Sequence, residues 1–398
     1  MLNTPFSPWP SFSEEEANCA RDIILSNKVN YWTGQECRQF EREFADWAET
    51  DYAVAVANGT VALDLALQAL DIGAGDEVIV TSRTFLASVS CIINVGAIPV
   101  FADVNADSQN IDASTIKSVL SPRTKAIICV HLAGWPCDMD PIMALATEHG
   151  IRVIEDCAQA HGARYKGKAI GSIGHIGAWS FCQDKIMTTA GEGGMVTTND
   201  RELWAKMWSF KDHGKSWEAV YERQHAPGFR WLHESFGTNW RMLEVQGGIG
   251  RIQLKRMPQW HQSRLANARR IWDCAKALPG LRVPETPNDI VHAAYKCYVF
   301  VESDQLAEGW DRDRILNEIG TCGVPCFSGS CSEVYLEKAF DNTPWRPEES
   351  LPVAARLGET SLMFLVHPTL TDAEMAKTCE VLTRVMHDAT GNEVLGGI

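Results

Sequence analysis

Short apolar, β-rich runs alternate with helical stretches between residues 52 and 198, and this alternation constrains the fold more than any other feature of the sequence. The runs lie at residues 53–57, 76–81, 98–104, 125–132 and 151–157. Apolar strands separated by crossover helices are typical of a parallel sheet covered on both faces, so the pattern predicts an α/β domain. Ligands of such sheets bind at the carboxyl ends of the strands, where a functional site is therefore expected.

The pattern changes in the last third of the chain. A long helical stretch from about residue 239 to 278 predicts a connector helix. After it, a strand-like run at 295–301, a helix at about 311–319 and a last helix after Thr371 predict a small α+β domain. We expect three parts: an N-terminal segment (residues 1–30) that packs with the small domain, a large domain with the connector helix (31–278), and the small C-terminal domain (279–398).

Charge and composition exclude several classes of function. Lys and Arg number 36 against 51 Asp and Glu, a net charge of −15 that would repel nucleic acid or an anionic membrane surface. The N-terminus shows no secretion signal, and no run approaches the roughly 20 apolar residues of a membrane span. The 13 cysteines are scattered and often lie in apolar runs, as expected for buried thiols in a reducing compartment. We expect a cytoplasmic protein with neither nucleic acid nor membrane as partner.

Polar segments stand where three of the strands are expected to end. Asn58-Gly59-Thr60 follows the first strand, where glycine allows close approach and a helix N-terminus offers free N–H groups to a phosphate. Asp156 closes a buried strand, either as a helix N-cap or as the anchor of a cationic ligand group. Lys185 follows Ser180 by five residues in a Thr- and Gly-rich loop, either as a solvated surface charge or as a Schiff-base amine.

A fourth segment, GTNWRMLEVQGGIG at residues 237–250, opens the long helical stretch with Asn239 and Arg241. Asn239 is either the N-cap of that helix or a ligand-binding amide. No metal site is predicted, because the spacing of the three cysteines between residues 322 and 331 matches the usual zinc patterns poorly and no histidine lies nearby.

Together these segments resemble the DegT/DnrJ/EryC1/StrS family of sugar aminotransferases, which depend on pyridoxal 5′-phosphate (PLP). The resemblance covers nearly the whole chain from about Asn30 and is carried by NGTVALDLAL, GDEVIV, TFLAS, VHLAG, IEDCAQAHGA, SFCQDK and GEGG in that order. It implies the type I aminotransferase fold and a homodimer whose active sites lie at the subunit boundary.

The resemblance also implies roles for single residues. Lys185 matches the lysine that holds the cofactor covalently and moves a proton, and Asp156 matches the carboxylate that faces the pyridine nitrogen. An anion at that position raises the pKa of the ring nitrogen and makes the cofactor a better electron sink. The remaining matches are Gln159 near the phenolic oxygen, Phe85 on the ring face, Gly59, Thr60 and Ser180 around the phosphate, and Asn239 contributed by the partner subunit.

Two segments depart from the family pattern, and both concern the substrate. The chain reads FKDHGK where family members commonly have an arginine, and VPCFSGSCSEVY at residues 324–335 where a Pro-Leu-His motif is common. We expect charges between residues 210 and 241 to hold a nucleotide diphosphate as a group, although each one alone is more often a solvated surface charge. The candidates are Lys211, His213, Lys215 and Arg230, with Arg223 and Arg241 nearby.

We therefore expect a PLP-dependent aminotransferase that converts a nucleotide-linked keto-sugar to an amino sugar for a polysaccharide or a glycosylated metabolite. By resemblance, L-glutamate is the amino donor and pyridoxamine 5′-phosphate is the intermediate form of the cofactor. A keto-inositol or similar cyclitol is the alternative acceptor. Two other classes stay open: a PLP-dependent sugar dehydratase, against which Lys185 argues because a histidine replaces the lysine there, and a PLP-binding regulator without turnover.

Overall fold

The computed structural model describes residues 5–224 and 230–391, and its centre is a seven-stranded sheet. In spatial order the strands are β1 (Tyr52–Val56), β9 (Gly194–Thr198), β8 (Ile176–Ser180), β5 (Arg152–Asp156), β4 (Thr124–Val130), β2 (Glu77–Thr81) and β3 (Ile98–Ala102). The strands from β8 to β3 are parallel to one another, and β9 is antiparallel to both of its neighbours. The predicted α/β class with a mostly parallel sheet is confirmed.

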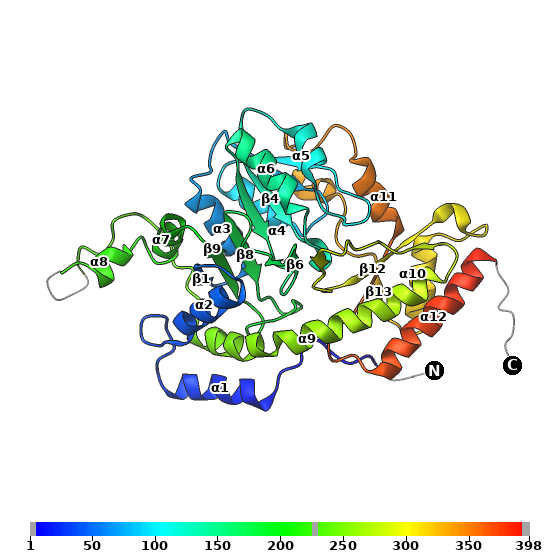
Figure 1. Ribbon diagram of the computed structural model, residues 1–398, viewed down its shortest axis with the longest axis horizontal. Helices are drawn as coiled ribbons and strands as arrows, with labels where there is room; N and C mark the ends of the chain where they lie inside the picture. Colours follow the sequence, from blue (N-terminus) through cyan, green and yellow to red (C-terminus); the bar gives the residue numbers. More distant parts are fainter. Residues whose placement is uncertain (1–4, 225–229, 392–398) are drawn as a thin grey trace.

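Helices cover both faces of this sheet (Figure 1). Alternate residues of a strand point to opposite faces, and in β1 Ala55 joins one hydrophobic core while Val56 joins the other. Phe40 extends the first core and Leu63 the second. The helices of this domain are α2 (Glu36–Trp47), α3 (Gly59–Ala69), α4 (Ala87–Asn94), α5 (Ala113–Val119), α6 (Met139–His149), α7 (Arg201–Phe210) and α8 (Trp217–Tyr221).

The long helix α9 (Glu244–Lys276) runs across the lower part of the view in Figure 1, from the large domain to the C-terminal part, with α1 (Glu14–Leu25) packed below it. The expectation that Asn239 opens this helix is wrong, because the helix begins at Glu244 with Leu243 as its N-cap residue. The segment before it is extended since it pairs with the chain just after β1, where the Ala57 N–H donates to the Trp240 carbonyl at 2.9 Å. Asn239 is therefore not the N-cap of α9.

The C-terminal part has its own antiparallel sheet and its own core. The strands are, in spatial order, β10 (Leu281–Arg282), β12 (Cys297–Val301), β14 (Ser361–Phe364) and β13 (Cys326–Phe327). The helices are α10 (Arg312–Thr321), α11 (Pro352–Thr360) and α12 (Asp372–Thr390). Helices α10 and α12 start close to the predicted positions, because the side chains of Asp311 and Thr371 accept N–H groups of the first turn.

Shorter elements join the two parts. A small third sheet contains β11 (Ile290–Val291), β6 (Arg164–Tyr165) and β7 (Lys168–Ala169), so it ties the segment after α9 to the large domain. Short 3-10 helices lie at Leu132–Gly134, Ser303–Gln305, Val334–Leu336 and Lys338–Phe340.

The N-terminal segment contacts both parts. Helix α1 (Glu14–Leu25) packs on α9, whereas Phe6 packs against the C-terminal core and Ser7 Oγ donates to Glu374 of α12 at 3.1 Å. Trp9 reaches further, and its Nε1 donates to the Lys185 carbonyl at 2.8 Å. The domain boundaries after residues 30 and 278 stay a prediction.

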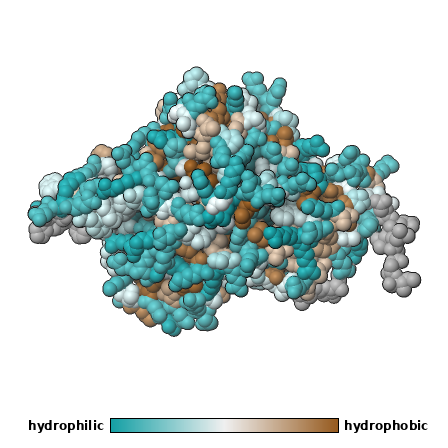
Figure 2. Space-filling model, in the orientation of Figure 1, coloured by the Kyte–Doolittle hydropathy of each residue, from teal (hydrophilic) through white to brown (hydrophobic). Residues whose placement is uncertain are grey.

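The face of the molecule in Figure 2 is largely hydrophilic, with hydrophobic residues in scattered patches. Large exposed apolar side chains include Ile24 and Leu25 of α1, and Trp231, Phe236 and Leu243 in the segment before α9. Across residues 5–224 and 230–391, the helices are all too short or too polar to cross a membrane. A cytoplasmic location stays a prediction.

Candidate active site

A cavity of about 590 Å³ lies at the carboxyl ends of the parallel strands, where ligands of such sheets bind. Its wall comes from the N-terminus of α3, the segment between β2 and α4, the end of β5, and the end of β8 with the loop that follows. The structure thus brings together seven residues that the sequence singled out: Gly59, Thr60, Phe85, Asp156, Gln159, Ser180 and Lys185.

The N-terminus of α3 supplies hydrogen-bond donors to this cavity. The Asn58 side chain caps the helix by accepting an N–H of the first turn at 3.0 Å. The N–H groups of Gly59 and Thr60 lie before the first intrahelical hydrogen bond, so they have no partner within the helix. A Cβ on Gly59 would lie 2.8 Å from Ser180 Oγ, and therefore glycine is needed for the helix to approach β8 this closely. These groups can hold an anionic oxygen.

Asp156 ends β5 and lies buried in the cavity wall. Ser88 Oγ donates to Oδ2 at 2.8 Å, and the Ala158 N–H donates to Oδ1 at 3.1 Å. No helix of the described chain begins directly after Asp156, which rules out an N-cap role. Burial raises the pKa of this carboxyl, and the Ser88 hydrogen bond and the Lys185 charge offset only part of that increase. A cationic group in the cavity would stabilise the carboxylate form.

Lys185 lies in the loop between β8 and β9 with most of its side chain buried. Its Nζ is 3.8 Å from Asp184 Oδ1 and 5.2 Å from the centroid of the Tyr295 ring. The Tyr295 hydroxyl donates to Asp184 Oδ2. Burial by itself would raise the pKa of Asp184, but the Lys185 charge and the Tyr295 hydrogen bond outweigh it and lower that pKa. Lys185 is therefore a largely buried amine that Asp184 positions at the cavity wall, and not a solvated surface charge.

Gln159 and Phe85 lie on the same wall. The Gln159 side-chain oxygen accepts the Ala133 N–H at 2.8 Å, which fixes the amide and leaves its NH₂ without a partner in the part of the chain that the structure describes. The Phe85 side chain is 72% exposed although it borders a cavity. An exposed aromatic ring beside a free amide donor suits a planar ligand with a polar substituent.

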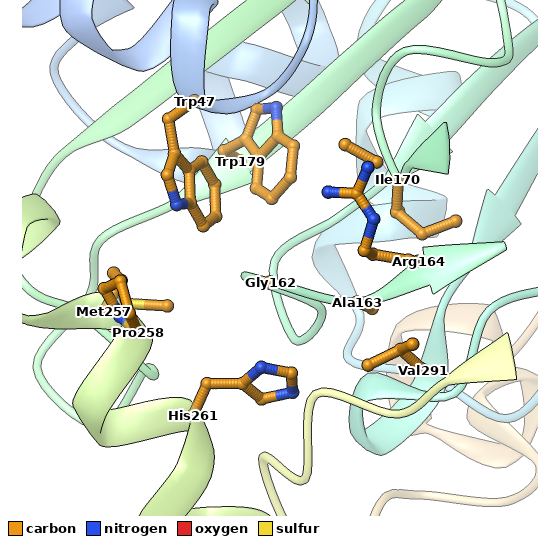
Figure 3. A pocket seen from close by; sticks show the side chains of 11 residues that line it. Trp47, Gly162, Ala163, Arg164, Ile170, Trp179, Met257, Pro258, His261 and Val291 are labelled. Carbon is orange, nitrogen blue, oxygen red and sulfur yellow. The ribbon is translucent and has the colours of Figure 1, made fainter. Parts of the chain in front are cut away.

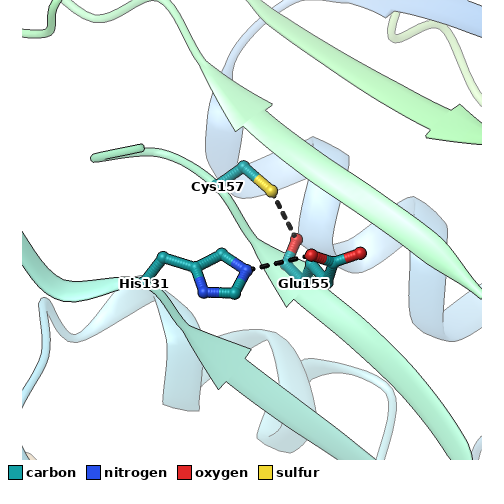
Figure 4. Close-up of side chains that lie close together, drawn as sticks. All are labelled: His131, Glu155 and Cys157. Atoms are coloured by element: carbon teal, nitrogen blue, oxygen red, sulfur yellow. Dashed lines mark hydrogen bonds and ion pairs between the residues drawn. The ribbon is translucent and has the colours of Figure 1, made fainter. Parts of the chain in front are cut away.

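A buried trio of His131, Glu155 and Cys157 lies beside the end of β5 (Figure 4). Their nitrogen, oxygen and sulfur atoms lie within 4.8 Å of one another, a spacing that suits a metal ion. However, His131 Nδ1 accepts the Cys137 N–H at 2.9 Å, so Nε2 carries the hydrogen and donates to Glu155 at 3.1 Å. Burial would raise the pKa of Glu155, but the His131 hydrogen bond and two glycine N–H groups lower it. The trio is a hydrogen-bond network that fixes the strand end.

A second cavity, of about 270 Å³, is lined mainly by aromatic and aliphatic side chains (Figure 3). Its ionisable side chains already have partners, because Arg164 pairs with Glu49 and His261 Nε2 lies 2.9 Å from the His292 carbonyl. Neither a lysine nor a carboxylate occurs among the described residues of its wall. The groups needed for covalent or acid-base chemistry therefore lie in the larger cavity.

Lys211 is placed differently from a loop charge that a nucleotide can reach. It is fully buried at the end of α7, with Nζ 3.6 Å from the centroid of the Tyr31 ring. Nζ has no hydrogen-bond partner within the described chain, and burial lowers the pKa of this lysine to about 8. A nucleotide in solution therefore cannot contact the Lys211 ammonium group in this structure, unlike the exposed loop charge that the sequence suggested.

The other predicted substrate contacts lie on the segment ahead of α9. His213 and Arg230 are exposed, whereas Lys215 pairs with Asp212 at 3.1 Å. Asn239 is exposed on the same segment, and its backbone bridges that of Asp212. None of the four lines the large cavity of its own chain within the described residues.

Sequence reasoning missed the side chains that hold Asp156 and Lys185 in place. Ser88 and Tyr295 are distant in sequence from the residues they serve, and no local pattern marks them. Asp184 had one available signal, because it stands directly before Lys185.

Fold and site together define a class of protein. A lysine amine suits the aldehyde of PLP, a buried carboxylate suits its ring nitrogen, and the N-terminus of α3 with Ser180 suits its phosphate. An α/β protein with these groups at the strand ends is a PLP enzyme of the type I aminotransferase fold. The chain belongs to the DegT/DnrJ/EryC1/StrS aminotransferase family, whose model matches residues 10–383. The resemblance seen in the sequence is confirmed.

Known proteins of this family cover nearly the whole chain. The crystal structure of an aminotransferase from Psychrobacter cryohalolentis is 65% identical and superposes with a TM-score of 0.95, covering 97% of this chain and 100% of that one. GDP-perosamine synthase of Caulobacter vibrioides is 35% identical over 386 residues, 92% of this chain and 95% of that protein. The dTDP-3-amino-3,4,6-trideoxy-alpha-D-glucose transaminase of Streptomyces venezuelae is 36% identical over 359 residues, 89% of each chain. Members of this family depend on PLP. A protein of similar structure has been solved in forms with PLP and with pyridoxamine 5′-phosphate.

Proposed function

We propose that this protein is a PLP-dependent aminotransferase that converts a nucleotide-linked keto-sugar to an amino sugar, with L-glutamate as the amino donor. The observation that carries the proposal is that Lys185 and Asp156 face one cavity whose wall also contains the N-terminus of α3. An amine, an anion and a set of phosphate donors are the three requirements of PLP-dependent transamination.

In this proposal Lys185 is the group that moves protons. When bound, PLP supplies a carbon that amines attack and a ring that takes up the electron pair left by a departing proton. The Lys185 amine would hold the cofactor between turnovers and would act as the acid and base that moves a proton at the substrate carbon. The Asp184 carboxylate lies 3.8 Å from Lys185 Nζ and helps to position the amine at the cavity wall.

Asp156 is the proposed partner of the protonated ring nitrogen. Ser88 and the Ala158 N–H each bind one of its carboxylate oxygens, so its orientation is fixed before a ligand arrives. Because the carboxyl is buried, a cation placed against it interacts more strongly than it would in water. A fixed, buried anion therefore keeps the proton on the ring, and that proton is what makes the ring accept electrons.

The remaining cavity residues bind and orient the cofactor. The N–H groups of Gly59 and Thr60 and the hydroxyl of Ser180 are assigned to the phosphate oxygens. The free NH₂ of Gln159 is assigned to the phenolic oxygen, and the exposed ring of Phe85 is assigned to one face of the pyridine. These residues would hold the cofactor at its phosphate, its ring nitrogen, its phenolic oxygen and one face.

The proposed active unit is a homodimer with shared sites. Asn239 donates to the phosphate in the partner's cavity, and His213, Lys215 and Arg230 approach the diphosphate of the sugar nucleotide there. The support is that His213, Arg230 and Asn239 are exposed and lie outside the cavity of their own chain, and that the apolar side chains of Trp231 and Phe236 nearby are exposed too. Exposed apolar side chains of this size are typical of a surface that another subunit covers.

The acceptor is proposed to be a sugar nucleotide because two of the relatives are named for GDP- and dTDP-linked amino sugars. Since those names carry different nucleotides, similarity alone leaves the nucleotide of this protein open. Lys185 at the cavity wall favours transamination over the dehydratase alternative, which has a histidine at this position.

A two-stage assay tests the proposal. PLP-loaded protein is incubated with L-glutamate, and we expect release of 2-oxoglutarate together with the conversion of bound PLP to pyridoxamine phosphate. A panel of nucleotide keto-sugars is then added, and mass spectrometry should find an amino sugar nucleotide. Loss of a hydroxyl without gain of nitrogen would identify a dehydratase, and failure of both stages would identify a regulator without turnover.

A further inference from the structure

A third cavity, of about 430 Å³, lies where the N-terminal segment meets α9 and the C-terminal sheet. Its wall includes Trp9, Arg264, Lys296 and His367, together with apolar side chains such as Phe6 and Phe327. Asp184 lines this cavity and also the cavity that contains Lys185. The two cavities therefore lie next to each other and share one carboxylate in their walls.

Arg264 is an unpaired buried cation in this wall. Its side chain is about 1% exposed, and a single long hydrogen bond joins Nη1 to the Tyr295 carbonyl at 3.4 Å. Nε and Nη2 are buried and have no partner in the described chain. The Trp9 ring lies over the guanidinium, 4.9 Å from Cζ to the ring centroid, so a ligand has to approach in the guanidinium plane. Two N–H groups in that plane match the two oxygens of a carboxylate.

Lys296 adds a second positive charge. It is partly buried and stacks on the Tyr295 ring at 4.7 Å, and no described carboxylate lies within ion-pair distance of its Nζ. Asp184 is the only acidic side chain among the described residues of the wall, and it is already engaged by Tyr295 and Lys185. Burial lowers the pKa of His367 to about 3, so that ring adds no charge. The wall therefore carries two cations, Arg264 and Lys296, and a single carboxylate, Asp184, that already has partners.

A buried guanidinium with two unused donors is costly unless a ligand completes it. The ligand should be a single carboxylate, because the wall is largely apolar, Trp9 covers one face of the guanidinium, and Asp184 would repel a polyanion such as a diphosphate. Tyr295 contacts both Arg264, through its carbonyl, and Asp184, through its hydroxyl. Tyr295 and Asp184 therefore connect Arg264 with Lys185, whose Nζ is 5.2 Å from the centroid of the Tyr295 ring.

We propose that this cavity binds a carboxylate group of the amino donor, with Arg264 giving two parallel N–H donors and Lys296 the second positive charge. This inference rests on the proposed function and adds to it the site that selects an acidic amino acid as donor. Arg264 and Lys296 act in binding, and Trp9 positions the guanidinium.

The test measures binding of glutarate, a dicarboxylate without an amine, to PLP-loaded protein by calorimetry. Arg264→Gln and Lys296→Met should each weaken glutarate binding about 10-fold to 100-fold, since each removes a charged hydrogen bond or ion pair. Arg264→Lys should restore part of the loss. Arg270→Gln is the matched control because Arg270 lies on the same helix and is exposed, so its binding should equal that of the wild type.

Pyrophosphate serves as the second probe. If Arg264→Gln and Lys296→Met weaken pyrophosphate binding and leave glutarate binding unchanged, the cavity holds the diphosphate and the inference is overturned. Unchanged glutarate binding in both variants overturns it as well. Lys296→Met, which alters a partly exposed side chain, decides the question if Arg264→Gln does not fold. Failure of the proposed function is separate: the wild type would then bind glutarate through these residues but release no 2-oxoglutarate from glutamate.

Discussion

The Ser88 hydroxyl is one of the groups that set the pKa of Asp156, and its contribution can be measured. Ser88 Oγ donates to Asp156 Oδ2 at 2.8 Å and lowers a pKa that burial raises. In Ser88→Ala that pKa should rise further, so the acid limb of the kcat/KM profile should move to higher pH and activity should fall about tenfold. Ser90→Ala on the same helix is the control, because Ser90 bonds only the Ala87 carbonyl. An acid limb that stays in place would contradict the assigned role of Asp156.

His161 is a buried base that should limit stability in acid. The centroid of its ring lies 5.2 Å from the ring centroid of Trp179 and 5.7 Å from that of Phe181. Neither ring nitrogen has a hydrogen-bond partner in the described chain. Burial lowers its pKa from 6.5 to about 3. Between these two pH values the unfolded chain binds a proton that the folded chain does not. Stability should therefore fall as the pH falls, by up to ~1.4 kcal/mol per pH unit from this residue.

Replacing His161 with Phe removes that titration and keeps an aromatic ring in the cluster. The free energy of unfolding, measured with urea between pH 7 and about pH 4, should then fall less steeply with pH than in the wild type. The difference in slope should be up to ~1.4 kcal/mol per pH unit. His292 and His367 titrate in the same direction and remain in both proteins, so some slope should persist. Equal slopes in the two proteins would show that His161 is protonated in the folded state.

At the scale of elements, the approach of α3 to β8 can be tested at one glycine. A Cβ on Gly59 would lie 2.5 Å from Ser180 Cβ, so Gly59→Ala should push the helix end from the strand. We expect unfolding free energy to drop by about 1–3 kcal/mol and PLP affinity, measured by fluorescence titration, to fall. Gly73→Ala is the control because its Cβ would meet nothing closer than 3.8 Å. Equal PLP affinity in both variants would remove α3 from the phosphate site.

The elements that the sequence predicted are those governed by local chemistry. Strands such as β2 have an apolar centre (residues 78–80), and α10 and α12 have Asp311 and Thr371 as capping residues. The start of α9 was misplaced because pairing with the chain after β1, which no local pattern reveals, keeps residues before Glu244 extended. The burial of Lys211 has the same origin, since its Tyr31 partner is distant in sequence.

The candidate site divides in the same way. Lys185 and Asp156 stand in the contiguous motifs SFCQDK and IEDCAQAHGA, which carry the resemblance to the family, so a single sequence is enough to locate them. Tyr295 reaches Asp184 from the chain beyond α9, and Arg264 reaches its cavity from within that helix. Only the fold brings such residues together, which is why the neighbouring cavity was not foreseen.

At the scale of the whole molecule, the shared-site proposal predicts complementation between two damaged chains. Lys185→Ala homodimers should be inactive, and Asn239→Asp homodimers should be weak because the new carboxylate would face a phosphate. After random exchange of equal amounts, half of the dimers are mixed and each has one intact site, so about a quarter of all sites should regain wild-type activity. Native mass spectrometry verifies the exchange. Verified mixed dimers without regained activity would place Asn239 outside the neighbour's site.

The central claim is that Lys185 is the amine of a transaminating site, and borohydride reduction tests it most directly. PLP-loaded protein is reduced, digested and mapped by mass spectrometry, with a parallel sample treated with L-glutamate before reduction. The account predicts a pyridoxyl group on Lys185 in the untreated sample and loss of that label after glutamate, because the cofactor then carries the amine and has left the lysine. A label on any other lysine, or a Lys185 label that glutamate does not reduce, would contradict the account.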